Sequence, residues 1–181
     1  MNTVYTIGHS THPLSEFIDI LSRFDIKAVA DVRTLPRSRH VPQYNQESLA
    51  VSLAEEGIDY RHFPGLGGLR HPSNDSLNTG WRNASFRGYA DYMQTCEFRK
   101  NLEQLMHLAE NKVTVIMCAE AVPWRCHRSL IGDALLIRGV PVIDIITSTS
   151  IRTHRLTPWA QVNGYAVSYP SPAEDSKPKT R

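Results

Sequence analysis

Cysteine is scarce in this sequence, and no long hydrophobic run occurs in it. The three cysteines are a small and odd number, which argues against a disulfide framework and favours a reducing compartment. No apolar stretch approaches the roughly 18 residues of a membrane span. Residues 1–7 lack the basic start and apolar run of a secretory signal. We therefore expect a cytoplasmic protein with no membrane segment.

Strong charge of either sign is also lacking. The formal net charge is +2, which is too mild to indicate a nucleic-acid coat or a membrane-surface patch. A chain of 181 residues, 41% of them hydrophobic, supports one full core but not two typical domains with a linker. We expect one domain over residues 1–169, with its motifs in residues 4–146. Residues 170–181 have almost nothing to bury and are predicted to form a flexible tail.

What the chain does contain is a regular alternation of strand and helix patterns. The predicted strands are residues 4–7, 27–32, 58–63, 113–118 and 141–146, and the predicted helices are residues 14–24, 46–56, 86–93, 98–110 and 129–138. Strands that alternate with helices pair in parallel through crossovers, and the helices cover both faces of the sheet. The pattern predicts a three-layer α/β sandwich with a mostly parallel, Rossmann-like sheet.

Two parts of the chain fall outside this alternation. Residues 64–83 are rich in turn formers, and a loop of about this length is usually functional or disordered. Beyond residue 147 the pattern weakens, and the remaining large side chains either add an edge strand or cover the sheet. These are Trp159, Tyr165, Val167 and Tyr169. Asn45 is the predicted N-cap of the helix over residues 46–56.

Polar residues and glycines follow the carboxyl ends of four predicted strands. In chain order they are His9 and Ser10, Asp31 and Arg33, Gly67 and Gly68, and Cys118 and Glu120. Ligands of open parallel sheets bind outside the carboxyl ends of the strands, so we expect these residues to share one rim. Structural alternatives exist for each: Asp31 and Arg33, two positions apart, also suit a simple ion pair, and the glycines also suit plain turns.

The densest group of reactive side chains lies at a predicted strand-to-helix turn. Within eleven positions it contains Cys118, Glu120, Arg125, Cys126, His127 and Arg128. A thiol beside a helix N-terminus and basic side chains has its pKa lowered from about 8.5, and we expect this of Cys118. The guanidinium groups of Arg125 and Arg128 offer forked donors near helix-start N–H groups, which suit phosphate, sulfate or carboxylate.

Three interpretations of this turn stay open. In the first, a small anionic, phosphate- or nucleotide-like ligand is bound, and the chain is a binding protein or an enzyme. The reactive groups are then Cys118 as nucleophile or redox thiol, Glu120 and His127 for proton transfer, and His9 and Asp31 to complete the site. The residues predicted to hold the ligand are Ser10, Arg33, Gly67, Gly68, Arg125 and Arg128.

In the second interpretation the chain binds a metal ion without catalytic turnover. The donors are Cys118, Cys126, His127 and either His9 or Glu120, a set that suits zinc or iron. In the third, the group only stabilises the turn, with Cys126 facing the sheet and Glu120 paired with Arg128.

A basic group follows the second predicted strand. It consists of Arg33, Arg37, Arg39 and His40. A phosphate-bearing ligand, nucleic acid included, would explain this group, and so would a solvated basic loop.

Several of these motifs recur in one known family in the same order. They are residues 6–10, residues 31–33 with Pro36 and Ser38, residues 66–68, residues 86–90, and residues 118–120 with Pro123 and residues 126–128. Together they resemble the Domain of Unknown Function 488 family. The resemblance implies a compact α/β domain of the bacterial or archaeal cytoplasm and supplies no reaction. Asp144 departs from it, because the resemblance places a histidine there.

Overall fold

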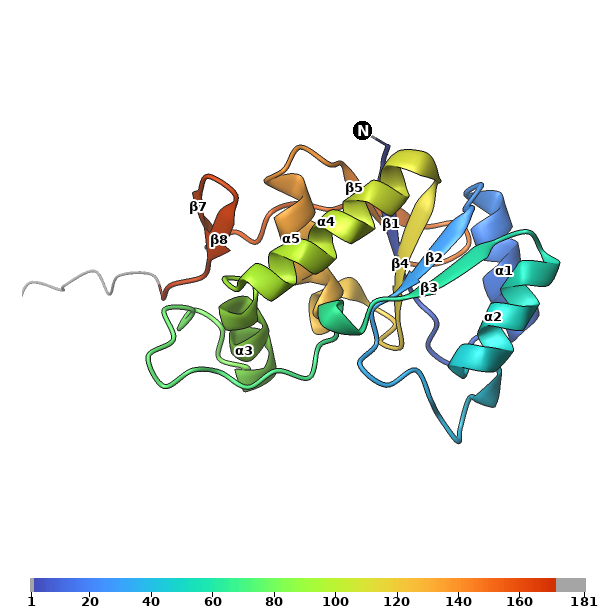
Figure 1. The fold of residues 1–181 in the computed structure, drawn as a ribbon, viewed down its shortest axis with the longest axis horizontal. Coiled ribbons are helices and arrows are strands. Elements are labelled where there is room, and N and C mark those ends of the chain that lie inside the picture. The colour runs from blue at the N-terminus through green and yellow to red at the C-terminus, as the bar shows by residue number, and fades with distance from the viewer. Residues whose placement is uncertain (1, 172–181) are drawn as a thin grey trace, which may run out of the picture.

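The structure, a computed structural model, describes residues 2–171 (Figure 1). The strands are β1 (Val4–Gly8), β2 (Ala28–Asp31), β3 (Asp59–His62), β4 (Thr114–Cys118), β5 (Val142–Ile145), β6 (Ile151–Thr153), β7 (Gln161–Asn163) and β8 (Ala166–Ser168). The helices are α1 (Leu14–Arg23), α2 (Gln46–Glu55), α3 (Ala84–Tyr92), α4 (Cys96–Asn111) and α5 (Arg128–Leu136). Three 3₁₀ turns are η1 (Pro42–Tyr44), η2 (Pro64–Leu66) and η3 (Pro123–Arg125).

A six-stranded sheet with the order β3-β2-β4-β1-β5-β6 forms the centre of the molecule. β1 to β5 pair in parallel, and β6 pairs antiparallel with β5. Helical connections join the parallel strands, as the geometry of parallel pairs requires. The predicted α/β class with a mostly parallel sheet is confirmed.

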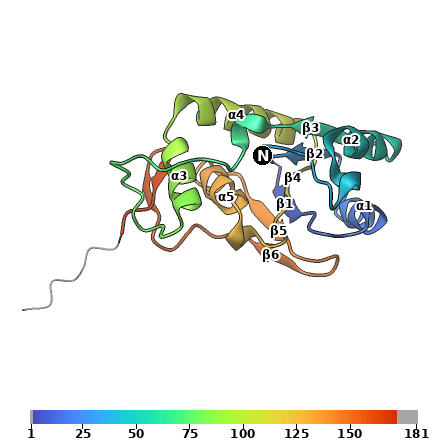
Figure 2. The ribbon, with the colours of Figure 1, turned by 90° about the horizontal axis from the view of Figure 1, so that it is seen from below.

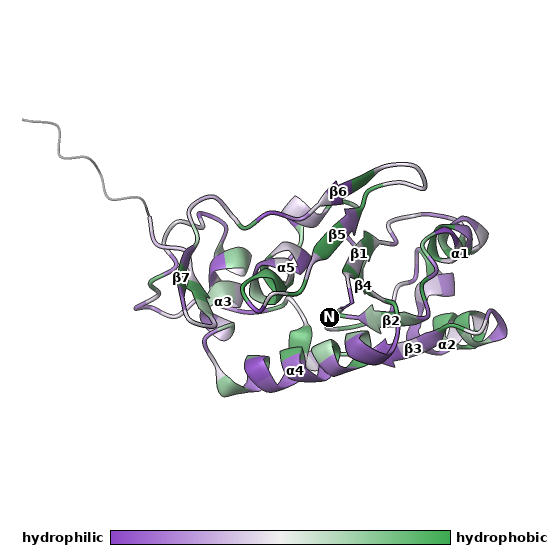
Figure 3. Cartoon of the chain, turned by 90° about the horizontal axis from the view of Figure 1, so that it is seen from above, coloured by the Kyte–Doolittle hydropathy of each residue, from purple (hydrophilic) through white to green (hydrophobic). Residues whose placement is uncertain are grey.

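The side chains of the central strands alternate between the two faces of the sheet. On β4, Val115 and Met117 pack into the core under α1 and α2, whereas Ile116 packs into the core formed with α3, α4 and α5. Figure 2 shows the same division of the helices about the sheet. Because both faces are covered, the central strands are largely apolar, and they are green in Figure 3 while α4 is mostly purple on its outer side. The arrangement confirms the predicted three layers.

Helix starts agree with the sequence patterns to within a few residues. Asn83 caps α3 by accepting from two backbone N–H groups, and Thr95 caps α4 in the same way through the Phe98 N–H. Asn45 occupies the N-cap position of α2, but its side chain makes no capping bond there. Its side chain accepts instead from the Ser38 N–H at 2.7 Å. The predicted position of Asn45 is therefore correct, but the predicted capping hydrogen bond is wrong.

The chain beyond β5 differs from the sequence expectation. The strand added at the edge beside β5 is β6, and every residue of β6 is exposed. A strand without buried residues has no alternation of apolar and polar residues from which it could be predicted. Val167 lies in the separate β7–β8 hairpin, and both Val167 and Tyr169 are buried in the core beside α3, α4 and α5. Tyr165 is largely exposed, whereas Trp159 is 37% exposed.

Within residues 2–171, no helix has the length and apolar content needed to cross a membrane. Of the tail predicted over residues 170–181, residues 172–181 lie outside the described residues.

Candidate functional site

The carboxyl ends of four parallel strands meet at one edge of the sheet, as predicted. In register, Gly8 pairs with Cys118, and Asp31 pairs with both Met117 and His62. The pairing continues past β1, since the His9 N–H donates to the Cys118 carbonyl at 2.9 Å. The polar segments that follow β1 to β4 therefore begin side by side.

The connections from β4 and β1, which are neighbours in the sheet, leave toward opposite faces. β1 leads into α1, whereas β4 leads through η3 into α5 on the other face. Such a switch point opens a crevice at the carboxyl ends of the two strands, and this is where open α/β sheets bind ligands. The rim beside Cys118 is thus the position expected for a site.

Gly8 allows the turn after β4 to approach the end of β1 closely. A Cβ atom at this position would lie 1.9 Å from the Glu120 carbonyl oxygen and 2.8 Å from the Ala121 Cα. Both are backbone atoms, so no side-chain movement would relieve the clash. Because Gly8 has no side chain, the backbone of Glu120 and Ala121 packs directly against the end of β1.

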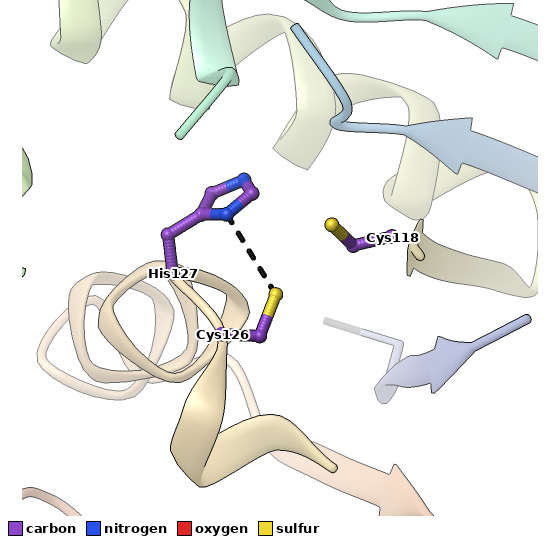
Figure 4. A group of neighbouring side chains, drawn as sticks. All are labelled: Cys118, Cys126 and His127. Atoms are coloured by element: carbon purple, nitrogen blue, oxygen red, sulfur yellow. Dashed lines mark hydrogen bonds between the residues drawn. The ribbon is translucent and has the colours of Figure 1, made fainter. Parts of the chain in front are cut away.

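Three donor atoms converge at the switch point. The Cys118 sulfur, the Cys126 sulfur and a ring nitrogen of His127 all lie within 4.8 Å of one another. Cys118 is the last residue of β4, and the other two lie between η3 and α5, with His127 at the N-cap of α5. Figure 4 shows the two sulfurs and the imidazole ring pointing into the same space. The turn brings together residues eight and nine positions apart in the sequence.

His127 is oriented by contacts on both nitrogens. Its Nε2 lies 3.0 Å from the Val32 carbonyl oxygen, which only accepts, so Nε2 carries a proton. Its Nδ1 lies 3.6 Å from the Cys126 sulfur. Gly68 packs against the ring, because a Cβ there would lie 2.4 Å from Nδ1. The ring is thus held with Nδ1 toward the thiols.

The two thiols have opposite electrostatic environments. The pKa of the Cys126 thiol is lowered, first by the hydrogen bond from Cys118, against the effect of burial, and then by His127 and Arg128. The same Cys118–Cys126 hydrogen bond, together with burial, raises the pKa of Cys118. The lowered pKa expected of Cys118 from the sequence therefore falls on Cys126.

Arg128 is the charged group buried deepest beside the thiols. Its side chain is 0% exposed, and its Nε donates to the Cys126 sulfur at 3.4 Å. Its Nη2 donates to the Glu120 carbonyl, so the predicted pairing with the Glu120 carboxylate was wrong. Its Nη1 has no hydrogen-bond partner among the described residues. Arg128 places a positive charge next to Cys126 and holds the turn after β4.

A cavity of about 440 Å³ opens beside the three donors. Most of the predicted site residues belong to its wall, namely Arg33, Gly68, Cys118, Glu120, Arg125, Cys126 and His127. Leu35, Leu69 and Phe86 supply an apolar part of the same wall. Arg125 is exposed and Glu120 is half-buried. The cavity offers both a charged and an apolar surface to a small ligand.

His9 and Asp31 do not line this cavity, and they form a buried network behind it. The Asp31 carboxylate accepts from Arg33 and from the Tyr60 hydroxyl, each at 2.6 Å. The Nε2 atom of His9 lies 3.2 Å from Arg33 Nη1. Burial lowers the pKa of His9 to about 4, outweighing its hydrogen bond to the Ser10 carbonyl, so the ring is neutral at pH 7. Much of the donor capacity of Arg33 is thereby used within the fold.

Three further predicted ligand residues, Ser10, Gly67 and the buried Arg128, also lie outside the cavity wall. Ser10 has the left-handed φ of 46°, and its N–H donates to the Ala119 carbonyl at 3.0 Å. Gly67 packs against Thr34. The basic group after β2 is divided as well, since Arg33 is buried whereas Arg37, Arg39 and His40 are exposed.

A second buried polar cluster was missed in the sequence. His154 lies between two carboxylates, 3.1 Å from Asp133 and 3.2 Å from Asp144. Burial opposes protonation of this ring, but the two carboxylates outweigh it and raise the pKa of His154 to about 9. Two features of the sequence could have indicated this cluster, namely Asp133 in a largely apolar predicted helix and Asp144 in an apolar predicted strand. Buried carboxylates need polar or charged partners, so a basic side chain was to be expected near them.

The fold and the site define an α/β sandwich with a cluster of thiols and imidazole at the switch point of a parallel sheet. A family model described as "Domain of unknown function DUF488" matches residues 13–135. The chain belongs to this family, which confirms the resemblance seen in its motifs. The matched range contains the whole turn from Cys118 to Arg128 but neither His9 nor Ser10. No curated protein and no solved structure matches the chain.

Proposed function

We propose that Cys118, Cys126 and His127 bind one zinc or iron(II) ion, and that a small anionic ligand occupies the adjoining cavity beside it. The convergence of three donor atoms within 4.8 Å of one another supports this assignment more than any other observation. Two thiols and an imidazole form a donor set that suits zinc and iron.

The orientation of His127 supports the same proposal. Histidine ligands commonly donate their second ring N–H to a backbone carbonyl, which fixes both tautomer and ring position. The Nε2 contact with the Val32 carbonyl at 3.0 Å has this geometry and leaves Nδ1 for the metal. Three protein donors leave one tetrahedral position open, and the cavity of about 440 Å³ lies beside them.

The charges on the cavity wall favour an anionic ligand. Arg125 is exposed there and supplies the free guanidinium of the wall, because the guanidinium of Arg33 is already paired with Asp31. Forked guanidinium donors suit carboxylate, sulfate and phosphate groups. Glu120 is a carboxylate on the same wall, and its role in the proposal is to take a proton from the bound ligand or from water.

A second candidate function is metal-free thiolate chemistry on the same ligand. The contacts of the Cys126 sulfur favour it, since Arg128 Nε lies at 3.4 Å and His127 Nδ1 at 3.6 Å. These contacts make Cys126 the nucleophile of this candidate in place of Cys118. Cationic neighbours of this kind stabilise a thiolate.

Metal analysis of the purified protein tests the proposal. We expect about one equivalent of zinc or iron after reconstitution and gel filtration, and loss of the ion in Cys118→Ser and Cys126→Ser. Cys96→Ser is the matched control, because Cys96 is exposed and outside the cluster. Equal metal content in wild type and Cys126→Ser would overturn the proposal.

Alkylation distinguishes the two candidates. In the metal centre, zinc bound to both sulfurs slows the reaction of Cys126 with iodoacetamide by at least about tenfold. If zinc gives no protection and Cys126 reacts rapidly in chelator-treated protein, the metal-free candidate holds. Protection by sulfate that is lost in Arg125→Gln would locate the anion at the cavity wall.

A further inference from the structure

All three tryptophans of the sequence line one cavity, which is separate from the proposed metal site. Trp81, Trp124 and Trp159 contribute to its wall, and its volume is about 220 Å³. Trp81 and Trp159 meet edge to face with ring centroids 5.1 Å apart. Trp124 is 53% exposed and Trp159 is 37% exposed, so these rings are not simply part of the core. Partly exposed aromatic rings around a cavity are typical of ligand sites.

Trp81 carries a hydrogen-bond donor that the fold leaves unused. Its indole Nε1 is buried and has no acceptor within residues 2–171. An indole N–H can only donate, and a buried donor without a partner costs about 1–3 kcal/mol. Because the atom is inaccessible in this arrangement, an acceptor on a ligand would satisfy it only after a movement of the Trp81 ring.

The charges around the cavity select an anion over a cation. Arg152 and Arg155 line it and are exposed, with the Arg152 guanidinium 5.8 Å from the centre of the Trp124 ring. Asp144 also lines it, but its carboxylate already accepts from Thr6 at 2.7 Å and contacts His154. The groups left for a ligand are therefore mainly positive charges and donors.

We propose that this cavity is a second binding site, which takes a planar aromatic base joined through a sugar to a phosphate, the chemistry of a nucleoside monophosphate. The tryptophan faces stack with the base, and each stacked pair contributes about 1–3 kcal/mol. The forked donors of Arg152 and Arg155 hold the phosphate. The volume of about 220 Å³ is below the roughly 300–1,000 Å³ of drug-sized ligand sites, so the cavity takes the base, and the sugar and phosphate extend from it toward the exposed arginines.

The two sites share the short segment between β4 and α5. Trp124 lines this cavity, whereas the next residue, Arg125, lines the cavity beside the metal donors. Binding at the tryptophans does not depend on a metal ion. The two proposals therefore fail or hold separately.

Tryptophan fluorescence tests the second site directly, because every tryptophan of the protein lies in it. Titration with adenosine monophosphate is expected to give a saturable change with a Kd below about 1 mM, in zinc-loaded and in chelator-treated protein alike. Adenosine and inorganic phosphate, each carrying half of the recognised chemistry, are expected to bind at least about tenfold more weakly.

Variants separate the ring from the charge. Trp124→Leu and Arg155→Gln are each expected to raise the Kd about tenfold, while Trp124→Phe retains most of the affinity. Arg37→Gln is the control, because Arg37 is exposed and does not line this cavity. Arg155 is on the surface, so its replacement leaves the fold intact.

Four outcomes would overturn the assignment. No saturable change up to about 10 mM would remove the site. If adenosine bound as tightly as adenosine monophosphate, the arginines would not bind the phosphate. If inorganic phosphate bound as tightly as adenosine monophosphate, the tryptophan rings would not bind the base. Tighter binding of a single-stranded oligonucleotide than of the monophosphate would make the cavity part of a nucleic-acid surface.

Discussion

The Cys126 sulfur contacts two basic side chains at the rim. Arg128 Nε lies 3.4 Å from it and His127 Nδ1 lies 3.6 Å from it. The Cys118 thiol lies within 4.8 Å of the same sulfur, and the interaction between the two thiols lowers the pKa of Cys126 while it raises that of Cys118. At the scale of single residues, the neighbours of each sulfur and not its place in the motif decide which one ionises first.

Gly68 supports the position of the His127 ring. In Gly68→Ala the new Cβ would lie 2.4 Å from Nδ1, so the ring must move from its present position relative to the thiols. Supporting groups around metal ligands are commonly worth about 10–100-fold in affinity. We expect zinc affinity, measured by competition with a chelating dye, to fall by at least about tenfold while far-UV circular dichroism is unchanged.

Leu69→Ala is the matched control for this prediction. Leu69 is 73% exposed and lines the same cavity. Its truncation opens space near the ligand without moving the ring, so zinc affinity is expected to stay within about twofold of wild type. Equal zinc affinity in Gly68→Ala and wild type would show that the glycine has no positioning role.

At the scale of elements, Arg128 joins the start of α5 to the turn after β4. Its Nη2 donates to the Glu120 carbonyl, and its Nε reaches Cys126. Lysine has no planar fork, so Arg128→Lys leaves one of these acceptors without its donor. We expect urea denaturation to show a loss of about 2 kcal/mol in the free energy of unfolding.

Arg125→Lys provides the comparison three positions earlier. Arg125 is exposed, and the replacement is expected to change the free energy of unfolding by less than about 0.5 kcal/mol. If Arg125→Lys and Arg128→Lys changed the free energy of unfolding by the same small amount, the buried guanidinium of Arg128 would not stabilise the turn after β4.

The elements differ in how well the sequence predicts them. Apolar strands that alternate with amphipathic helices predict the parallel sheet and the shared rim, because register and handedness follow from that pattern. β6 has no buried residue, so its place at the edge follows from tertiary contacts alone. The cavity beside Cys118 likewise depends on how the loop over residues 64–83 folds back, which local patterns do not specify.

For the site residues, too, the sequence predicts the position along the chain but not every tertiary contact. The sequence predicts that Cys118, Cys126 and His127 lie near the rim, since all belong to one strand-to-helix turn. It does not predict that His9 turns inward toward Arg33, because that requires the packing of Tyr44, which stacks on the imidazole at 4.1 Å. Contacts between distant segments decide which polar residue faces the cavity.

At the scale of the whole molecule, titratable groups are buried on both faces of the sheet. His9 stacks on Tyr44, which belongs to the core under α1 and α2. His154 contacts Asp133 of α5 on the other face. The His9 ring is buried in its neutral form and the His154 ring in its charged form. Their contributions to the free energy of unfolding therefore change with pH in opposite directions.

The free energy of unfolding is therefore expected to be greatest near pH 6.5. The pKa of His154 is raised to about 9 by Asp133 and Asp144, despite burial, so its contribution is complete below about pH 6.5 and is lost as pH rises through 9. Burial lowers the pKa of His9 to about 4, so its contribution is complete above about pH 6.5 and is lost as pH falls toward 4. Each contribution amounts to about 3 kcal/mol.

The variant His154→Gln tests the alkaline half of this dependence. Asp133, Asp144 and the Tyr169 hydroxyl, which donates to Asp133 at 2.9 Å, are the titratable groups of this cluster. Urea denaturation across pH 6.5–9 is expected to show a decline of about 3 kcal/mol in wild type that is largely absent in His154→Gln. His107→Gln, which removes an exposed ring 3.6 Å from Glu110, is expected to keep the wild-type profile. Parallel declines in wild type and His154→Gln would show that the buried imidazolium does not control stability at alkaline pH.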